Sequence, residues 1–341
     1  MRLLLFAGLF FPIFLNAQEG RGDLRFVFYN VENLFDPFDD SLTADDEFLP
    51  AGGRRWTWNR FEENVNRIYK VLVALGGWEP PEIIGLCEIE NHFVLHRLVT
   101  KTPLRKHEYR IIHRDSPDPR GIDVALLYRP GLFQPLYYRY YTVQAEEDLL
   151  DPTRDILYVH GMINGKDSLH LFLNHWPSRW EGILESRPER VAAAWILRRL
   201  IDSLSDAGNK PRILVAGDFN DEMSDHSLKD ILGVQYAGNE LNDSILYFPG
   251  EEHALSRSGT LKYHGTWFGF DLILANGSLL ADSALFVRKD GFRVFAPGFL
   301  LEKDPQWLGL RPFRTYYGYR YAGGFSDHLP VFIDIFTDAM Q

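Results

Sequence analysis

Hydrophobic residues follow two patterns along this chain: short, almost continuous apolar runs, and longer stretches in which apolar positions recur every three or four residues. The short runs end at Gly, Pro or polar residues, and they predict buried β-strands. The strands are expected at 24–29, 82–87, 121–129, 155–163, 168–173, 212–216, 270–275 and 330–335.

The longer stretches predict two helices. The first spans 59–75, with Asn59 as a plausible N-cap. The second spans 188–204 and has Pro188 in its first turn, where the missing N–H does no harm.

The order of these elements bears on the kind of sheet they form. Strands and helices alternate, yet two of the strands are joined by Asn164-Gly165, a strong signal for a hairpin turn. This combination favours mixed sheets over a fully parallel one. Because no internal repeat or linker interrupts the pattern, we expect one domain from about 24 to 336.

Composition narrows the class of protein. The chain has 341 residues, of which 45% are hydrophobic and 24% charged, as in an ordinary globular protein with a sizeable core. The net charge of −11 argues against a protein that coats nucleic acid by charge alone. It does not exclude an enzyme that grips a phosphodiester locally through a metal ion and a few arginines. The single cysteine, Cys87, lies in an apolar run and is expected to be a small buried hydrophobe.

The first 17 residues have the pattern of a secretory signal peptide. Arg2 is followed by an apolar run from Leu3 to Leu15, and Ala17 is a suitable small residue at the cleavage point. An apolar run of this length is short for a membrane span. We therefore expect an exported protein, periplasmic or secreted, with a charge of −12 and no stable membrane insertion after cleavage.

Polar side chains stand where several predicted strands begin or end. Asp218 and Asn220 come shortly after one apolar run, and Asp327 and His328 come shortly before another. Carboxylate and amide oxygens are the ligands that a hard divalent cation prefers, and histidine can act as a base. These are the groups that metal-assisted hydrolysis of a phosphate ester needs.

Any one such segment is a weak signal, but six of them in one order are specific. They are Tyr29-Asn30-Val31-Glu32-Asn33, Leu86-Cys87-Glu88-Ile89-Glu90-Asn91, Leu173-Asn174-His175-Trp176-Pro177, Gly217-Asp218-Phe219-Asn220, Gly269-Phe270-Asp271 and Ser326-Asp327-His328. In this order the chain resembles the endonuclease/exonuclease/phosphatase superfamily, and in particular its exported bacterial members. The resemblance covers nearly all of the mature chain. It implies the DNase I-like fold, an α/β (α+β) four-layer sandwich in which two mixed β-sheets pack face to face with helices on both outer faces.

The resemblance also implies a metal site. Glu88 matches the principal metal-ligating glutamate, with Asn30 beside it, and Asp327 contributes to the same site. Glu32 stands where several relatives have aspartate, and its longer side chain is expected to act behind the ligands. The implied cofactor is Mg²⁺, with Mn²⁺ or Ca²⁺ as substitutes.

The remaining matched residues are implied to be catalytic. Asp218 and Asn220 match the pair that faces the phosphate, the metal and the attacking water. His328 matches the histidine that acts as base or contacts the phosphate, and Asp271 matches the aspartate that orients it. His175 matches the second histidine, used for protonation of the leaving group or for phosphate binding. Whether His328 or Asp218 takes the proton from water stays open.

Two further patterns suggest metals, and both have simpler explanations. His92 and His96 lie four apart on an expected helix, a spacing that can bind zinc, but no third ligand is evident. The acidic loop 36–53 suggests calcium, but it lacks the spacing of a calcium-binding loop. An exposed helix face and a solvated loop are the expected interpretations.

The segment 286–325 differs in charge from the rest of the chain. It has seven basic and three acidic residues, which gives +4 against −15 elsewhere, and aromatic residues are interspersed among them. Such a segment suits a phosphate backbone with stacked bases, although its aromatics could instead pack on the edge of a sheet. Arg120, Arg187 and Arg314 are expected phosphate contacts, with Arg179 and Arg190 as weaker candidates.

Three functions are compatible with these observations. The first is an exported, magnesium-dependent nuclease that hydrolyses phosphodiester bonds of DNA or RNA. The alternative is a phosphodiesterase or phosphatase that acts on a lipid head group or on a phosphorylated small molecule such as an inositol phosphate. The third, an inactive binding protein on the same scaffold, is disfavoured because every polar residue of the six segments is retained.

Overall fold

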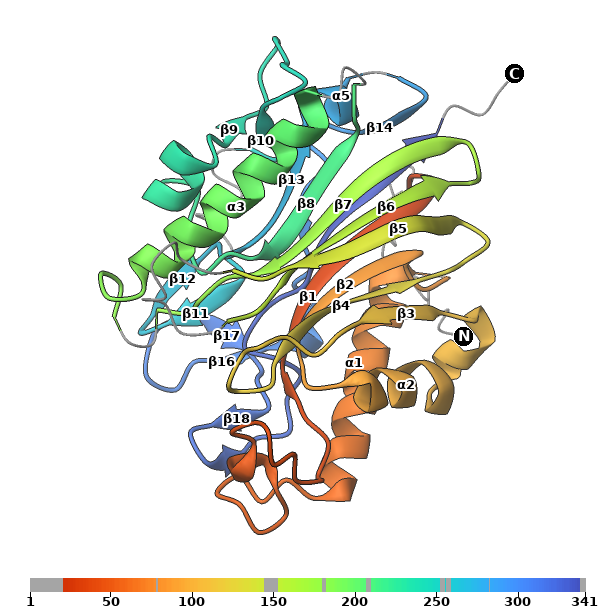
Figure 1. Ribbon diagram of the computed structural model, residues 1–341. Coiled ribbons are helices and arrows are strands. Elements are labelled where there is room, and N and C mark those ends of the chain that lie inside the picture. Colours follow the sequence, from red (N-terminus) through yellow and green to blue (C-terminus); the bar gives the residue numbers. More distant parts are fainter. Residues whose placement is uncertain are drawn as a thin grey trace, which may run out of the picture.

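The computed structural model describes residues 21–77, 79–143, 153–179, 182–206, 210–251, 255, 259–281 and 283–337. The expected signal peptide, 1–17, lies outside the described residues. Two large mixed sheets pack face to face, and helices cover both outer faces (Figure 1). The expected four-layer sandwich is confirmed. Among the described residues, no helix has the length and apolarity needed to cross a bilayer.

One sheet contains both ends of the described chain, since its first strand pairs with its last in antiparallel fashion. Its first strand also pairs with the second strand in parallel, so the sheet is mixed. In spatial order the sheet consists of β14 (Leu285–Val287), β20 (Val331–Thr337), β1 (Leu24–Leu34), β2 (Ile83–Ile89), β4 (Asp123–Tyr128) and β3 (Arg110–His113), with β15 (Arg293–Val294) also paired to β20.

The second sheet is mixed as well, with one parallel pair in its centre. In spatial order it consists of β5 (Phe133–Tyr141), β6 (Ile156–Ile163), β7 (Asp167–His175), β8 (Ile213–Asp218), β13 (Asp271–Asn276), β10 (Leu246–Phe248) and β9 (Gln235–Tyr236). The hairpin between β6 and β7 turns at Asn164 and Gly165, both with positive φ, as expected for an Asn-Gly turn.

Helices cover the outer faces of the two sheets (Figure 1). The helices are α1 (Trp58–Gly76), α2 (His92–Lys101), α3 (Arg187–Asp206) and the short α5 (Gly277–Leu280). The expected N-cap Asn59 is wrong: Thr57 is extended and its side chain accepts from the N–H of Arg60, so the helix begins at Trp58. Single-turn helices lie at Asp46–Phe48, Pro103–His107, Ser227–Ile231 and Gly298–Leu300.

The segment 286–325 is not an open loop. Beyond β14 and β15 it folds into two hairpins, β16 (Leu301–Lys303) with β17 (Leu310–Pro312), and β18 (Tyr316–Tyr317) with β19 (Arg320–Tyr321). A further hairpin, β11 (Leu261–Tyr263) with β12 (Thr266–Phe268), precedes β13.

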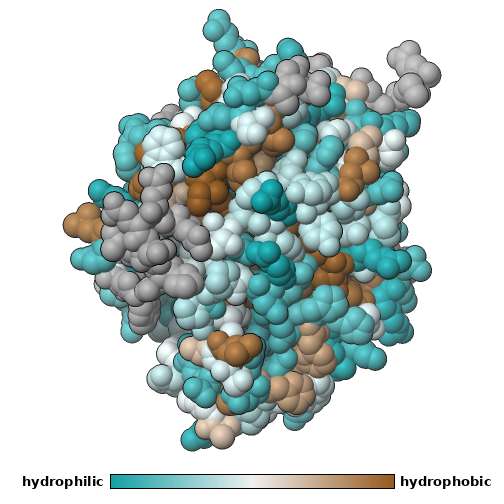
Figure 2. Space-filling view, viewed as in Figure 1, coloured by the Kyte–Doolittle hydropathy of each residue, from teal (hydrophilic) through white to brown (hydrophobic). Residues whose placement is uncertain are grey.

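Alternation along β1 explains how the layers hold together. Phe26 and Phe28 face the core between the sheets, while Val27 and Tyr29 face the core under α1 and α2. Both faces of this strand are therefore buried, which is why its residues from Phe26 to Tyr29 are all apolar. Apolar side chains on the face shown in Figure 2 form separate patches among hydrophilic ones.

The two sheets approach each other closely at Gly85 in β2. A Cβ atom there would lie 2.8 Å from Cδ2 of Leu173 in β7 and 3.1 Å from Cδ2 of Phe28. The position therefore has no room for a side chain, although its backbone is an ordinary strand.

We expect Gly85→Ala to destabilise the protein by about 1–3 kcal/mol, because the added methyl group overpacks the core between the sheets. Denaturant unfolding followed by circular dichroism measures this. Gly131→Ala is the matched control, since a Cβ there meets no atom within 4 Å. Adding Leu173→Val to Gly85→Ala should recover part of the loss; strictly additive effects would contradict the contact.

Candidate functional site

The polar segments expected at strand ends meet at one edge of the sandwich. In the second sheet, His175 and Asp271 both pair with Asp218 in register, so three side chains stand on adjacent strands at one level. In the first sheet, Asn30 pairs with Cys87, directly before Glu88. The two sets touch across the sandwich, because Nδ2 of Asn30 donates to Oδ2 of Asp218 at 3.0 Å.

A bulge in β1 and β2 sets the direction of Glu88. The register shifts beyond Asn30 and Cys87, and Glu88 has φ of 60°, an uncommon conformation for a residue with a side chain. Its Oε1 accepts from Nδ2 of Asn30 at 3.2 Å, and its Oε2 accepts from the N–H of Asn33 at 2.8 Å. Such a bulge re-aims a side chain that the regular strand would place elsewhere.

The amide of Asn30 holds two carboxylates together. Its Nδ2 donates to both Glu88 and Asp218, while its Oδ1 accepts from the N–H of Glu32 at 3.0 Å. Asn30 is fully buried. In this conformation the amide positions carboxylate oxygens of its two neighbours, and its Oδ1 keeps a second lone pair, so the expected role of Asn30 beside the metal stays a prediction.

His328 is fixed by Asp271 and faces Asp218. Its Nδ1 lies 2.7 Å from Oδ2 of Asp271, and its Nε2 lies 3.7 Å from Oδ2 of Asp218. Ser326 secures the approach to this histidine, because its Oγ accepts from the N–H of His328 and donates to the backbone oxygen of Asn30. The sequence expectation that Asp271 orients His328 agrees with this geometry.

Burial and charge determine the protonation of this group. Burial raises the pKa of Asp218 to about 7, against the opposing charge of His328. Burial lowers the pKa of His328, but the carboxylates of Asp271 and Asp218 outweigh it and raise that pKa well above its usual value. Asp218 and His328 therefore titrate as an interacting pair, in which the charge of each affects the protonation of the other.

His175 lies between Arg154 and Asp218, with its Nε2 3.9 Å from Oδ2 of Asp218. Its Nε2 lies 3.2 Å from a guanidinium nitrogen of Arg154, which can only donate, so Nε2 accepts and the proton resides on Nδ1. Burial and the charge of Arg154 lower the pKa of His175 well below its usual value. The expected role of His175, protonation of the leaving group or phosphate binding, stays a prediction. The guanidinium is itself anchored by Asp118 at 2.8 Å.

The loop after β8 is shaped by close packing and by two arginines. A Cβ at Gly217 would lie 2.5 Å from the backbone oxygen of Asn174, so the residue before Asp218 must be small. Asn220 has φ of 50° and its Nδ2 donates to the backbone oxygen of Trp176 at 3.0 Å. This bond ties the Asn220 loop to the segment that contains His175.

Arg179 and Arg190 hold the loop after β8 in place. Arg179 donates to the backbone oxygen of Asn220 at 2.6 Å and to Asp221 at 2.8 Å. Arg190 is 1% exposed and donates to Asp221, to Ser186 and to backbone oxygens. Burial with these partners leaves Arg190 no free face for a substrate.

The three expected substrate arginines have different positions. Arg120 is exposed and donates to Oδ1 of Asn33 at 3.0 Å, beside the Glu88 bulge. Arg314 pairs with Glu32 at 2.9 Å and with Asp327 at 2.8 Å. Arg187 is exposed at the start of α3, and no hydrogen bond or ion pair among the described residues connects it to the site.

Asp327 and Glu32 both belong to the Arg314 cluster. Glu32 also accepts from the N–H of Thr315 at 2.6 Å, which places it behind the site as expected. Asp327 pairs with Arg314 through its Oδ2, and its expected role as a metal ligand stays a prediction. Arg154 and Asp118 were not expected from the sequence, because neither stands at a strand end or in a recognisable pattern.

The donor atoms fit a hard divalent cation. Oxygens of Glu88 and Asp218 converge on one amide, and ligand atoms of Asp218, Asp271 and His328 all lie within 4.8 Å of one another. Oδ1 of Asp271 is buried without a hydrogen-bond partner. Buried carboxylates in this number call for a positive counter-charge, which Mg²⁺ or a similar ion supplies.

The histidines of α2, which were expected to lie on an exposed helix face, are exposed. His92 and His96 lie on that helix with ring centroids 6.3 Å apart. A separate group, His113 with Asp115 and Asp123, lies on β3, the loop after it and the start of β4. Neither group shares a residue with the site described above.

The sequence matches the model of the Endonuclease/Exonuclease/phosphatase family over residues 25–337. The chain belongs to this family. Members of the family hydrolyse phosphoester bonds and depend on a divalent metal, and the buried acid and histidine group is the candidate site for that chemistry in this chain. No curated protein matches the sequence.

Solved structures of the family share the fold. An endonuclease/exonuclease/phosphatase family protein from Bacteroides thetaiotaomicron aligns with a TM-score of 0.56 and 16% identity, over 93% of this chain and 98% of that one. A humanized D. rerio TDP2 aligns at 0.55 and 16%, over 92% and 99%. The mannosyl-6-phosphatase Bt3783 of Bacteroides thetaiotaomicron aligns at 0.52 and 16%, over 92% and 99%. At these identities the likeness establishes the fold alone.

We expect Asp271→Asn to lower the pKa of His328 by about 1–3 in metal-free protein, because an adjacent negative charge is removed. The histidine ring signal titrated by NMR in the presence of chelator measures this. His226, an exposed residue paired with Asp230 on another element, is the internal control. An unchanged titration of His328 would contradict the electrostatic role assigned to Asp271.

Proposed function

We propose that this chain is an exported phosphodiesterase that hydrolyses nucleic acid with the help of a divalent metal ion. The observation that supports it best is the position of Asp218. One oxygen of this buried carboxylate faces both the amide that holds Glu88 and the Nε2 of His328. Asp218 therefore belongs both to the donors that would bind the metal and to the pair that would take the proton. Attack by a metal-assisted water requires these two functions side by side.

The side chains then have defined tasks in the reaction. A divalent ion held by Glu88 and Asp218 supplies positive charge beside the phosphate. Asp218 and Asn220 hold the attacking water, and its proton passes to the Asp218–His328 pair, whose facing atoms are 3.7 Å apart. The water oxygen bonds to phosphorus as the ester P–O bond breaks, and the leaving oxygen keeps the electron pair of that bond and takes a proton from solvent water. Asp271 keeps the ring of His328 in place throughout.

Local charge favours a diester over a monoester. Carboxylates outnumber guanidinium groups around the site, and two of the guanidinium groups are already paired with carboxylates. A monoester dianion would meet more repulsion here than a singly charged diester, since the interaction scales with the product of the charges. The carboxylates are Glu32, Glu88, Asp118, Asp218, Asp271 and Asp327, and the guanidinium groups are those of Arg120, Arg154 and Arg314.

Nucleic acid and export rest on separate observations. Exposed aromatic rings stand beside Asp327, on the same side as the site, and suit stacked bases. Export rests on the signal-peptide pattern of residues 1–17. The acidic surface implies that such a substrate is held locally, without a broad basic face.

We expect chelation to abolish hydrolysis and added Mg²⁺ or Mn²⁺ to restore it. Asp218→Asn should lower kcat by roughly 10²–10⁴, because it removes the proton acceptor and a metal-binding oxygen together. Plasmid DNA and RNA serve as substrates in both tests. Full activity in excess chelator would disprove the metal requirement.

Two controls separate chemistry from folding and from substrate choice. Asp218→Asn replaces a buried carboxylate with a neutral group, so its thermal unfolding should match or exceed that of the wild type. Asp230→Asn, an exposed change, should leave kcat unaltered. Parallel assays on sphingomyelin, inositol phosphates and hexose phosphates test the substrate: cleavage of these alone would overturn the assignment to nucleic acid.

A further inference from the structure

A pocket opens directly beside the catalytic group, between the β11–β12 and β16–β17 hairpins. Leu261 in β11 forms a β-bridge with His328, and Asp327 lines the pocket itself. The cavity has a volume of about 170 Å³, smaller than the 300–1,000 Å³ typical of sites that enclose a whole ligand. It has room for one ring-sized group attached to a phosphate at the site.

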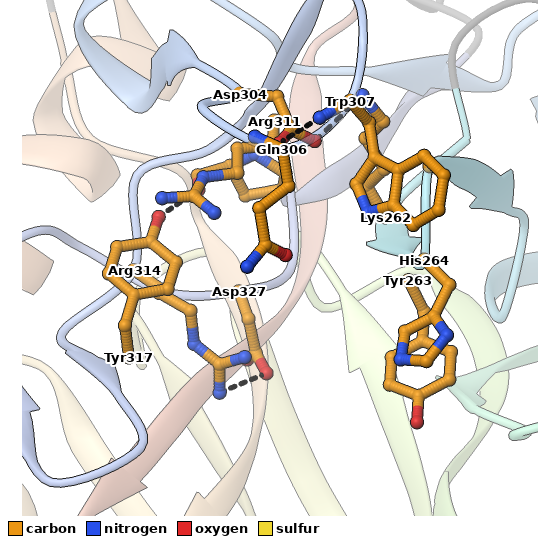
Figure 3. A pocket seen from close by; sticks show the side chains of 12 residues that line it. Lys262, Tyr263, His264, Asp304, Gln306, Trp307, Arg311, Arg314, Tyr317 and Asp327 are labelled. Atoms are coloured by element: carbon orange, nitrogen blue, oxygen red, sulfur yellow. Dashed lines mark hydrogen bonds and ion pairs between the residues drawn. The ribbon is translucent and has the colours of Figure 1, made fainter.

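One side of the pocket consists of exposed aromatic rings. Trp307 and Tyr263 are 49% and 60% exposed, so both rings present a face to solvent. The rings of Tyr263 and His264 stack 4.2 Å apart at 19°, and those of His264 and Trp307 are 6.4 Å apart at 24°. Three nearly parallel rings thus gather on one wall, across the pocket from Arg314 and Tyr317 (Figure 3).

The lysine and arginines of this pocket are already neutralised. Nζ of Lys262 lies 3.0 Å from Asp304, and these two side chains are only 3% and 4% exposed. Arg311 pairs with Glu302 at 2.6 Å. Since Arg314 pairs with Asp327, each of the three cations in the lining has a carboxylate partner. The pocket is therefore unsuited to a second phosphate and suited to an uncharged ring.

The aromatic wall is held in place before any ligand binds. Oδ1 of Asp304 accepts from the N–H groups of Gln306 and Trp307, both at 3.0 Å, which fixes the tip of the β16–β17 hairpin. Trp307 covers Gly265, where a Cβ would lie 2.9 Å from the indole ring. The amide of Gln306 points into the space between the two sides (Figure 3). A flat surface with one adaptable amide is thus preorganised next to the site.

We propose that this pocket binds the nucleobase next to the scissile phosphate, with the base stacked on the Trp307 wall and its edge hydrogen-bonded to Gln306. The assignment rests on the proposed function, since it takes the substrate to be a nucleic-acid phosphodiester. A base is planar and uncharged and has donors and acceptors on its edge, which matches the parallel rings, the neutralised cations and the amide. Trp307 is thereby a specificity-determining residue.

The test uses a thymidine dinucleotide and two analogues in which a tetrahydrofuran unit replaces the nucleoside on the 5′ or the 3′ side of the phosphate. Trp307→Ala should lower kcat/KM on the full dinucleotide roughly 10- to 100-fold, the value of one stacked base. It should change kcat/KM less than twofold on the analogue that lacks the base bound by the pocket. Trp307→Tyr should recover most of the activity.

Controls keep the outcomes distinct. Trp195→Ala, on α3 and 51% exposed, is the matched control and should behave as wild type on all three substrates. The proposal would be overturned if Trp307→Ala lowered kcat/KM equally on all three substrates, or on none of them. An effect of this variant confined to hexose phosphates would overturn it as well. If wild type cleaves no phosphodiester at all, the proposed function fails first, and that failure is visible without any variant.

Discussion

The site depends on the burial of several carboxylates where the edges of the two sheets meet. Asp218 and Asp271 are each 1% exposed, and they stand opposite each other in neighbouring strands. Charges buried this deeply are unfavourable unless they are paired or bind a metal. The bulge at Glu88, the amide of Asn30 and the ring of His328 all serve to hold these charges together. A divalent ion bound here would supply positive charge that balances the buried carboxylates.

Most arginines near the site already have partners, which explains why a divalent ion is needed. Arg190 and Arg179 are occupied in holding the loop after β8, and Arg154 is occupied by Asp118 and His175. Arg314 is shared between two carboxylates. The arginines that sequence alone suggested for phosphate binding thus mostly rigidify the site. This leaves Arg120 and His328, together with the divalent ion that the carboxylates would hold, as the main positive charges facing a substrate.

Most of the framework could be predicted from sequence, and the loops could not. Each expected strand is present because most of its residues are buried and so form an apolar run, although in β20 buried and half-buried residues alternate. The segment 286–325 was ambiguous, since its aromatics divide between the core, as Tyr316 does, and the surface, as Trp307 does. The N-cap of the first helix was misplaced by two residues. Thr57 and Asn59 are both acceptable caps, and only the structure shows that Thr57 is extended and accepts a helix N–H.

The sequence by itself determined the order of polar residues at strand ends, and hence the family and the groups available for chemistry. The tertiary structure decided what each group faces. No sequence pattern shows that Arg154 lies against His175, because this contact joins distant segments. No pattern shows that Oδ1 of Asn30 accepts from the N–H of Glu32 either, because this bond follows from the bulge. Hydrogen bonds and pKa shifts depend on neighbours in space, and only the packing of the two sheets determines those neighbours.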